Sequence, residues 1–533
     1  MNQVELKKRQ VELVSYILGM VFWLILGGML GENGVTYVAF AFESYLFFSM
    51  LINSRLADTL GKLIRGRMTR GQYKNAAKLR KNAMILEGII GIAGALLVFA
   101  VAGLLEEKIF GLKYCTAMLR ILAPAVLLRT VSSVLLGYFQ GEGTELPTVI
   151  SCLMRRICTF LFALLFIFLL GNYGQKVSAL LRQENFIAMF SGFGLVLAIL
   201  VSETLVTLFL FLVYRGSRGK ERKGNGEGMR TTDTFGSQVN LLVASLLPLV
   251  FIVLLQHLPV WLGMFFYRRS VTELVNLNPY GVLYGKYLPL IVIFALPAHI
   301  FLLGNCYRTV SSLRKEEQRF ARNHFNGGLH MGIIYGVFVA MFVAIMASPF
   351  AELICGQANE AAAQMLRFGS FLIPCLIAGF YFTEILLLSG GKIQVLVALT
   401  LKNIVYVVAL LLFLNNTKAG ILALIYAGLI SEIIYMLAAG AVLCYQCRFN
   451  IDWLQHLAIP AGAACVTGLV LLFISRGTVP HLGSLAGILV CLVIGMACYV
   501  FLLLLIRNFR DQELNFIPGG KLIRMIGQAL RIF

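Results

Sequence analysis

Charged residues are scarce in this chain of 533 residues. They make up 13% of it, about half of the roughly 25% that is typical of soluble domains. A surface so poor in charge excludes a soluble globular enzyme, a secreted protein and a receptor with a single membrane anchor. Hydrophobic residues make up 59% of the chain, which is enough for roughly fifteen membrane spans of about 20 residues each. The composition therefore predicts an all-α polytopic membrane protein.

Motifs of soluble enzymes are also missing. The segment 390–392, GGK, lacks the upstream glycine and the hydroxyl residue of a phosphate-binding loop. No His-Glu-x-x-His occurs, the six histidines are scattered, and the Cys-x-x-Cys at 444–447 has no second ligand pair. The eleven cysteines lie almost entirely in apolar stretches, which is typical of small core residues and not of a disulfide framework. We expect no catalytic residue, no metal and no cofactor, and hence no enzyme.

About fourteen apolar stretches are long enough to cross a membrane. They are too long and unbroken for β-barrel strands, which would alternate polar and apolar residues. The basic segment 7–9 resembles the start of a signal peptide, but no small-residue cleavage site follows it, so we expect the first stretch to be retained. The predicted spans are 13–30, 35–54, 83–104, 116–139, 147–170, 186–214, 239–266, 283–306, 328–350, 365–388, 393–414, 420–444, 456–475 and 483–506.

Basic residues exceed acidic ones by 45 to 25, which gives a net charge of +20. Of the lysines and arginines, 32 fall on the side of the predicted N-terminus and 9 on the opposite side. Cytoplasmic loops of membrane proteins are enriched in Lys and Arg. The asymmetry therefore predicts a protein of the cytoplasmic membrane with both termini in the cytoplasm. The excess of positive charge therefore indicates topology and not a nucleic-acid partner.

Two basic segments have an amphipathic pattern. In 521–533 and in 56–67, apolar residues recur on one helical face and lysines or arginines on another. Such helices can lie on an anionic membrane surface, which would make anionic lipids a partner. Solvated loops that only set the topology explain the same pattern, and both interpretations stay open.

The chain carries signs of an internal duplication. The segments 86–90 and 330–334 are similar, and Met-Leu-Arg at 118–120 recurs at 365–367, at offsets of 244 and 247. A Gly-rich basic segment separates two sets of six spans, which predicts two lobes related by an axis along the membrane normal. The predicted organisation is an N-terminal lobe (1–214), a cytoplasmic linker (215–236), a C-terminal lobe (237–446), and a final helix pair with a basic cytoplasmic tail (447–533).

Ionisable residues inside spans are the candidates for function, because each costs at least about 2.5 kcal/mol at the centre of the bilayer unless a partner or a wet cavity receives it. For Glu43, Arg129 and Glu384 we favour a role in a cavity. For Lys286, Arg120 and Arg367 we favour snorkelling near helix ends or a structural ion pair. The full set is Glu43, Glu87, Arg120, Arg129, Glu203, His299, Arg367, Glu384, Lys402 and Glu432, with Lys286 at the edge of a span.

Three short motifs carry a resemblance to a known family. They are LAP at 122–124, GYFQG at 137–141 and PT at 147–148. This pattern resembles the fourth and fifth helices of the polysaccharide-lipid flippase branch of the multidrug/oligosaccharidyl-lipid/polysaccharide exporter superfamily. GQYKNA at 71–76 looks like the loop after the second helix in that branch. Fourteen spans, as six plus six plus two, also match the group of stage V sporulation B and lipid II flippases.

The resemblance implies two six-helix lobes around a central cavity and the flipping of an undecaprenyl-diphosphate-linked saccharide by alternating access. It implies cavity cations for the diphosphate, for which Arg55, Arg129, Lys286 and His299 are the candidates. Glu43 and Glu384 are the candidates for coupling to H+, Na+ or the membrane potential. Lipid II flippases carry a cavity arginine in the first helix, whereas residues 16–30 here have no charge, so the saccharide headgroup and any protein partner stay open.

Two other functions fit parts of the pattern. A cation-coupled multidrug exporter of the same superfamily would share the six-plus-six arrangement, although such exporters usually lack the final pair of spans. A membrane-embedded glycan-processing enzyme would usually present carboxylates on sizeable loops. The predicted exoplasmic loops are short, and the largest of them, between the fifth and sixth spans and after Trp261, contain no paired acids.

Overall fold

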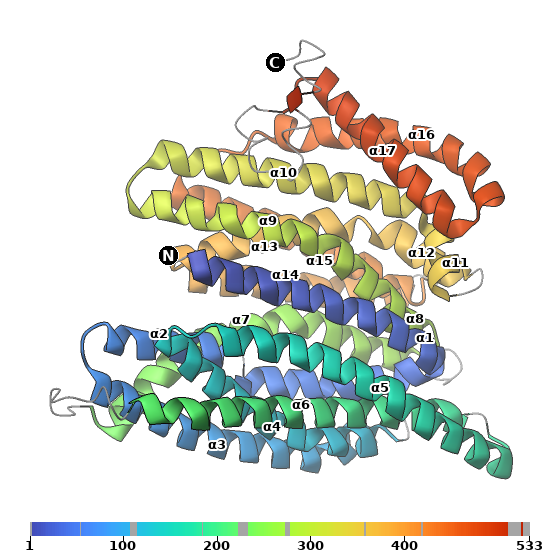
Figure 1. Ribbon diagram of the computed structural model, residues 1–533. Coiled ribbons are helices and arrows are strands. Elements are labelled where there is room, and N and C mark those ends of the chain that lie inside the picture. The colour runs from blue at the N-terminus through green and yellow to red at the C-terminus, as the bar shows by residue number, and fades with distance from the viewer. Residues whose placement is uncertain are drawn as a thin grey trace. The chain divides into compact units, whose positions relative to one another are not determined.

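Helices account for all the regular secondary structure in the residues that the computed structural model describes, which are 3–53, 55–106, 114–183, 185–221, 233–271, 278–355, 359–416, 419–509 and 524–525. The prediction of an all-α polytopic membrane protein is confirmed (Figure 1). The elements are α1 (Gln3–Asn53), α2 (Leu56–Met68), α3 (Tyr73–Leu104), α4 (Cys115–Glu142), α5 (Leu146–Leu181), α6 (Asn185–Glu221), α7 (Phe235–Ser270), α8 (Asn278–Val282), the π-helix η3 (Leu283–Tyr287), α9 (Leu288–Arg314), α10 (Gln318–Ile345), α11 (Ala347–Cys355), α12 (Glu360–Gly369), α13 (Leu372–Ser389), α14 (Lys392–Asn416), α15 (Leu422–Cys447), the π-helix η4 (Leu454–Ala458), α16 (Ile459–Leu482) and α17 (Ser484–Leu505).

The described residues contain 13 helical stretches that are long and apolar enough to span a membrane, against about fourteen predicted. The difference lies in α1, where the backbone breaks at Gly31, with φ 66° and ψ 171°. Trp23 and Phe42 stack with their ring centroids 6.0 Å apart, although 19 residues of straight helix would separate them by about 28 Å. The chain therefore turns back at Gly31, and the two halves of α1 correspond to the first two predicted spans.

The chain divides into two compact units, Lys7–Tyr284 on the one hand and Met1–Leu6 with Gly285–Phe533 on the other. α7 belongs to the first of these units, whereas the sequence analysis began the second lobe at residue 237. The physical reason is that α7 packs on α2 and α3. Leu242 of α7 joins their apolar core, and the amide of Asn82 donates a hydrogen bond of 2.7 Å to Gln238.

The GYFQG segment is where α2 packs closely against α4. A β-carbon at Gly137 would lie 3.0 Å from Cβ of Leu60, and one at Gly141 would lie 2.5 Å from Cγ2 of Ile64. Small residues four apart allow two helices to approach in this way. Between the glycines, Tyr138 is buried in a core with residues of α6. The most recognisable motif of the sequence is therefore a packing device and not a set of reactive groups.

The apolar face of α2 is covered by protein. Leu56 and Leu60 are fully buried and Ile64 nearly so, in a core that includes residues of α3, α4 and α7. This face is unavailable for insertion into a membrane surface, so the interfacial interpretation of 56–67 is wrong because tertiary packing uses the same residues. The second amphipathic segment, 521–533, lies outside the described residues apart from 524–525.

The segment between α6 and α7 is shorter than the predicted linker, 215–236. α6 continues to Glu221 and α7 begins at Phe235, while residues 222–232 lie outside the described part of the chain. At the other end of the chain, α16 and α17 lie side by side as a pair (Figure 1). The Tyr499 hydroxyl of α17 donates to the carbonyl of Ile334 in α10. This hydrogen bond links the pair to α10 within the unit that contains Gly285–Phe533.

Candidate functional site

Polar side chains gather inside the spans of the unit Lys7–Tyr284. The carboxylate of Glu43, in the second half of α1, lies 2.5 Å from Nε2 of His257 in α7. Glu43 is 3% exposed, so the histidine satisfies a carboxylate that would otherwise be costly to bury. The Tyr284 hydroxyl of η3 hydrogen-bonds to the same carboxylate, and the indole of Trp23 donates to the Tyr284 carbonyl at 3.3 Å.

Three arginines from α4 and α5 lie in the same unit. Arg155 donates through Nε to Glu203 of α6, at 3.0 and 3.1 Å from its two oxygens. Arg129 lies within electrostatic reach of Glu203 and of the Tyr45 hydroxyl. The guanidinium of Arg156 lies 5.4 Å from the centre of the Tyr16 ring, a cation–π distance.

A glycine makes room for one of these cations. A β-carbon at Gly19 would lie 2.9 Å from Cδ of Arg156, so this arginine crosses α1 directly over the glycine. We define the membrane polar cluster as the charged side chains and tyrosines that share this region. Its members are Tyr16, Glu43, Tyr45, Arg129, Arg155, Arg156, Glu203, His257 and Tyr284.

The membrane polar cluster is richer in positive than in negative charge. Its three arginines face two carboxylates, with one histidine that can add a further charge. Guanidinium groups bind phosphate oxygens through paired, charge-assisted hydrogen bonds. A phosphate that replaces Glu203 as the partner of Arg155 keeps the guanidinium paired, while the buried carboxylate loses its cation.

Three basic members of this cluster, and its three tyrosines, were not among the residues singled out from the sequence. Arg155 and Arg156 were counted only among the charges that set topology, but they lie ten residues into α5, about 15 Å along the helix. His257 was overlooked, and the signal that would have found it is a histidine inside the apolar stretch 239–266. Of the predicted site residues, the structure brings Glu43 and Arg129 into this unit and places each beside a charged or polar partner.

Arg55 belongs to a different group of charges. It starts α2 in a left-handed conformation, with φ 58°, and its Nη1 lies 3.7 Å from Asp58. Asp58 also receives Lys8 of α1 at 3.3 Å, and Lys8 lies 3.8 Å from Glu145 at the start of α5. Lys8 is 7% exposed. This network joins the beginnings of α1, α2 and α5, and Arg55 is its only member that the sequence singled out.

A second link holds the beginning of α7. Arg67 of α2 donates two hydrogen bonds to one oxygen of Asp233, at 2.9 and 3.2 Å. These bonds hold the pKa of the Asp233 carboxyl below its usual range, chiefly because they favour the charged form. Lys78 of α3 donates to the Asp233 carbonyl at 2.6 Å. Asp233 thus ties α7 to α2 and α3 outside the spans.

The other predicted site residues lie in the unit that contains Gly285–Phe533. Lys286 is half-buried beside a small apolar cavity that Ala351 and Leu366 help to line. His299 is half-buried, and its ring stacks on Phe380 with centroids 4.0 Å apart. Glu384 of α13 is 7% exposed. Lys286 and His299 thus lie in different surroundings.

Four of the remaining charges inside the predicted spans are structural or superficial. Lys402 of α14 and Glu432 of α15 form a buried ion pair, which links two helices. Arg120 is exposed on α4 with its guanidinium 5.0 Å from the Phe99 ring. Arg367 is exposed on α12, a helix of ten residues, and so does not lie in the middle of a span as expected. Among the described residues, no group of three or more His, Cys, Asp or Glu side chains could hold a metal ion.

Comparison with known proteins adds sequence and fold similarity. Residues 10–258 match the family model described as polysaccharide biosynthesis protein. The chain is 23% identical to the lipid II flippase MurJ of Bacillus subtilis (strain 168) over 190 residues, which are 34% of this chain and 35% of the relative. It is 23% identical over 145 residues to the stage V sporulation protein B of the same organism, over 27% of this chain and 28% of the relative. The aligned segments thus span about a third of the length of these relatives.

Solved structures match over much more of the chain. The inward closed conformation of lipid II flippase MurJ superimposes with a TM-score of 0.63 at 12% identity, over 92% of this chain and 97% of that one. An inward-facing transporter of the multidrug resistance MATE family, of the MOP superfamily, matches with a TM-score of 0.60 at 14% identity, over 83% of this chain and 99% of that one. At such identities the likeness establishes the fold, and the sequence matches favour the polysaccharide branch.

Proposed function

We propose that this chain, a membrane transporter of the multidrug/oligosaccharidyl-lipid/polysaccharide exporter superfamily in its polysaccharide-lipid flippase branch, moves a lipid-linked saccharide of the undecaprenyl-diphosphate type across the cytoplasmic membrane. The observation that carries the proposal is the membrane polar cluster, in which cations outnumber carboxylates inside apolar helices. A diphosphate needs cationic partners when it leaves water, whereas the polyprenyl tail can stay in lipid.

The diphosphate and the carboxylates of the cluster would alternate as partners of the arginines. In the structure Arg155 is paired with Glu203, and Arg156 rests on Tyr16. A diphosphate would compete with Glu203 for guanidinium hydrogen bonds, and the carboxylate would receive the arginines again once the headgroup has left. In the exchanged state Glu203 is buried without its main cation, and this cost favours release of the headgroup over tight retention.

The Glu43–His257 pair is the proposed point of energy coupling. The two groups are 2.5 Å apart on α1 and α7, so the charge of each acts directly on the other. Uptake of a proton changes the charge of the pair and thus its tendency to hold these two helices in contact. We propose H+ as the coupling ion on this geometry, and alternating access as the movement that it drives.

Reconstitution tests the function directly. The purified chain would be placed in vesicles that carry a fluorescent polyprenyl-diphosphate saccharide, and exchange between leaflets would be followed with a membrane-impermeant quencher. Arg129→Gln should slow the exchange at least tenfold, because a lost charged hydrogen bond costs about 1.5–3 kcal/mol. Arg120→Gln is the matched control, since Arg120 lies exposed on the same helix. Exchange no faster than in protein-free vesicles, for every headgroup tried, would refute the proposal.

A cation-coupled multidrug exporter is the second candidate, and the likeness to the MATE transporter over 83% of this chain favours it. This function predicts that overexpression lowers the susceptibility of cells to cationic drugs. Unchanged susceptibility together with leaflet exchange would exclude it. Consumption of a sugar donor by the purified protein would instead favour a glycan-processing enzyme.

The charge asymmetry supports an orientation with both termini in the cytoplasm. In that orientation the Lys8 network and the Arg67–Asp233 link lie on the cytoplasmic side. Labelling from outside intact cells tests it. A cysteine introduced at Asn415, at the end of α14, should react with an impermeant thiol reagent, whereas one at Lys62 should not react until the membrane is opened.

A further inference from the structure

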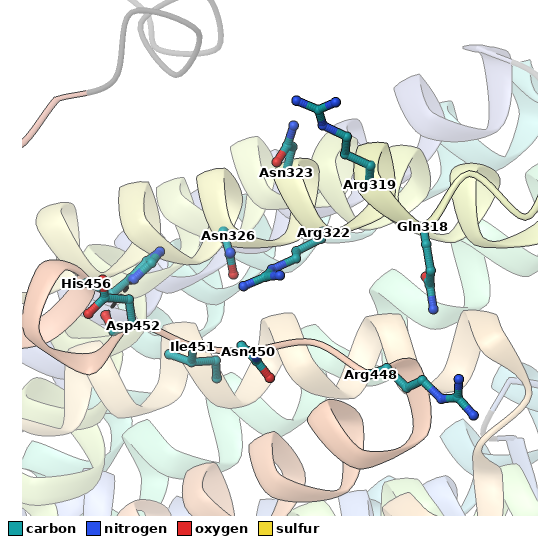
Figure 2. A pocket seen from close by; sticks show the side chains of 10 residues that line it. All are labelled: Gln318, Arg319, Arg322, Asn323, Asn326, Arg448, Asn450, Ile451, Asp452 and His456. Atoms are coloured by element: carbon teal, nitrogen blue, oxygen red, sulfur yellow. Dashed lines mark hydrogen bonds between the residues drawn. The ribbon is translucent and has the colours of Figure 1, made fainter.

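An open pocket lies in the unit that contains Gly285–Phe533, and its lining includes none of the predicted site residues and no member of the membrane polar cluster. It has a volume of about 580 Å³ and lies between the first turns of α10 and the segment that joins α15 to η4 (Figure 2). Its polar lining includes Gln318, Arg319, Arg322, Arg448, Asn450 and Asp452. Three arginines therefore share the pocket with a single carboxylate.

The arginines of this pocket are not neutralised by their neighbours. None of the ion pairs within the described ranges involves Arg319, Arg322 or Arg448. In Figure 2 Arg322 reaches from α10 toward the segment 450–452, whereas Arg319 points to the other side of α10 and contributes at the rim. Arg448 lines the pocket directly after the end of α15, and in Figure 2 its side chain points away from Arg322.

Two polar residues of the lining are buried. Asn326 is 9% exposed, and within the described part of the chain its Oδ1 is buried without a hydrogen-bond partner. His456 is 1% exposed, and its Nδ1 lies 2.7 Å from the Asp452 carbonyl. The N-terminal end of α10 adds the positive end of a helix dipole, since this helix begins at Gln318.

An apolar surface adjoins the charged pocket. Trp453 is 48% exposed and Leu454 is 69% exposed, directly after the lining residues of the connecting segment. Phe320 is 59% exposed in the first turn of α10. Tryptophan is typical of the boundary between membrane and water. Cations beside exposed apolar side chains fit an amphiphile with an anionic head better than a fully water-soluble anion.

We propose that this pocket binds the phosphate-bearing headgroup of a lipid, with Arg322 and Arg448 as the principal phosphate ligands. The site is separate from the membrane polar cluster, and its position on the cytoplasmic side rests on the orientation proposed above. A phospholipid and a polyprenyl phosphate share this headgroup chemistry. A bound anionic lipid would lie between α10 and the segment that leads into η4 and α16, within the unit that contains Gly285–Phe533.

Native mass spectrometry of the full chain in detergent tests the site. Phosphatidylglycerol, a polyprenyl phosphate, phosphatidylcholine and inorganic pyrophosphate would be titrated in separate arms. The two anionic lipids should bind, and the Arg322→Gln/Arg448→Gln variant should bind them at least tenfold more weakly. Lys62→Gln/Arg70→Gln removes the same charge from exposed positions of the other unit and should bind as the parent does.

A variant that is expected to bind more tightly distinguishes loss of the site from loss of the fold, because a misfolded protein would not gain affinity. Asp452→Asn removes the one carboxylate of the lining and keeps an oxygen for the amide of Gln455, so it should tighten binding of anionic lipid severalfold. Binding of pyrophosphate that depends on Arg322 and Arg448 would support the site and show that phosphate alone suffices. Equal affinity for anionic and zwitterionic lipid, or equal losses in the two double variants, would overturn the proposal. None of these arms requires leaflet exchange, so the site and the flippase function can fail independently.

Discussion

Removal of Arg155 should leave a carboxylate buried without its main cation. Glu203 is 3% exposed and receives Arg155 at 3.0 Å. Breaking a buried pair by removing one partner costs about 3–5 kcal/mol. Arg129 remains within electrostatic reach of Glu203 and compensates in part, so we expect Arg155→Gln to lower the free energy of unfolding by about 2–4 kcal/mol.

Removal of Glu203 should lower the free energy of unfolding by less than removal of Arg155 does. Glu203→Gln leaves Arg155, whose side chain is 20% exposed and can turn toward a more polar region, so a loss of about 1–2 kcal/mol is expected. In the double variant both groups are neutral and can hydrogen-bond to each other. The double variant should therefore be more stable than Arg155→Gln alone, which corresponds to a coupling energy of about 1–3 kcal/mol between the two positions.

The assay is unfolding in mixed micelles by added sodium dodecyl sulfate, followed by circular dichroism, for the parent and the three variants. Arg120→Gln provides the control for loss of an arginine from an exposed position and should change the unfolding free energy by less than about 0.5 kcal/mol. Strictly additive losses in the double variant would show that Arg155 and Glu203 contribute independently, and would refute the reasoning from a buried pair.

Three further outcomes are expected. Gly141→Val should lower the unfolding free energy by about 1–3 kcal/mol because its β-carbon lies 2.5 Å from a side chain of α2, whereas Gly66→Ala, which has open space around it, should be neutral or stabilising in the same assay. Asp233→Asn should lower stability at pH 7, by up to about 1 kcal/mol, and this difference should vanish on acidification. The sign follows from the lowered pKa of Asp233. The stabilising link to Arg67 is fully present above the unfolded pKa of about 3.9 and is lost as the pH falls through the lower folded value. A difference in stability that persists below pH 2 would contradict this assignment. Glu43→Gln should slow leaflet exchange and remove its dependence on an imposed pH gradient, and exchange that still responds to the gradient would exclude this pair as the coupling point.

Much of the fold could be predicted because it depends on chain-local physics. A stretch of about 20 apolar residues must form a helix in lipid whatever its neighbours are, since no water is there to receive the backbone groups. The break at Gly31 also follows locally, because glycine tolerates the positive φ that the turn requires. The correspondence between the two halves of α1 and the first two predicted spans shows how far this reasoning extends.

The functional residues could be predicted only in part. Glu43 and Arg129 stood out because ionisable groups in apolar stretches are costly, but nothing in the sequence pairs Glu43 with His257, 214 positions away. Arg155 and Arg156 were counted as loop charges because an arginine near the end of a span looks the same whether it faces water or Glu203. The amphipathic pattern of 56–67 was equally ambiguous, since protein and membrane both cover an apolar face.

The sequence by itself determined that this chain is a polytopic helical membrane protein, that its positive charge is unevenly distributed across the spans, and which family it resembles. These properties depend on composition and on runs of adjacent residues. Only the tertiary structure decided that the GYFQG motif is a helix-packing contact, that Glu43 meets His257, and that Arg322 and Arg448 share a pocket. Such contacts join residues that are remote in sequence, and they form because helix packing selects one arrangement from many that the same apolar pattern allows.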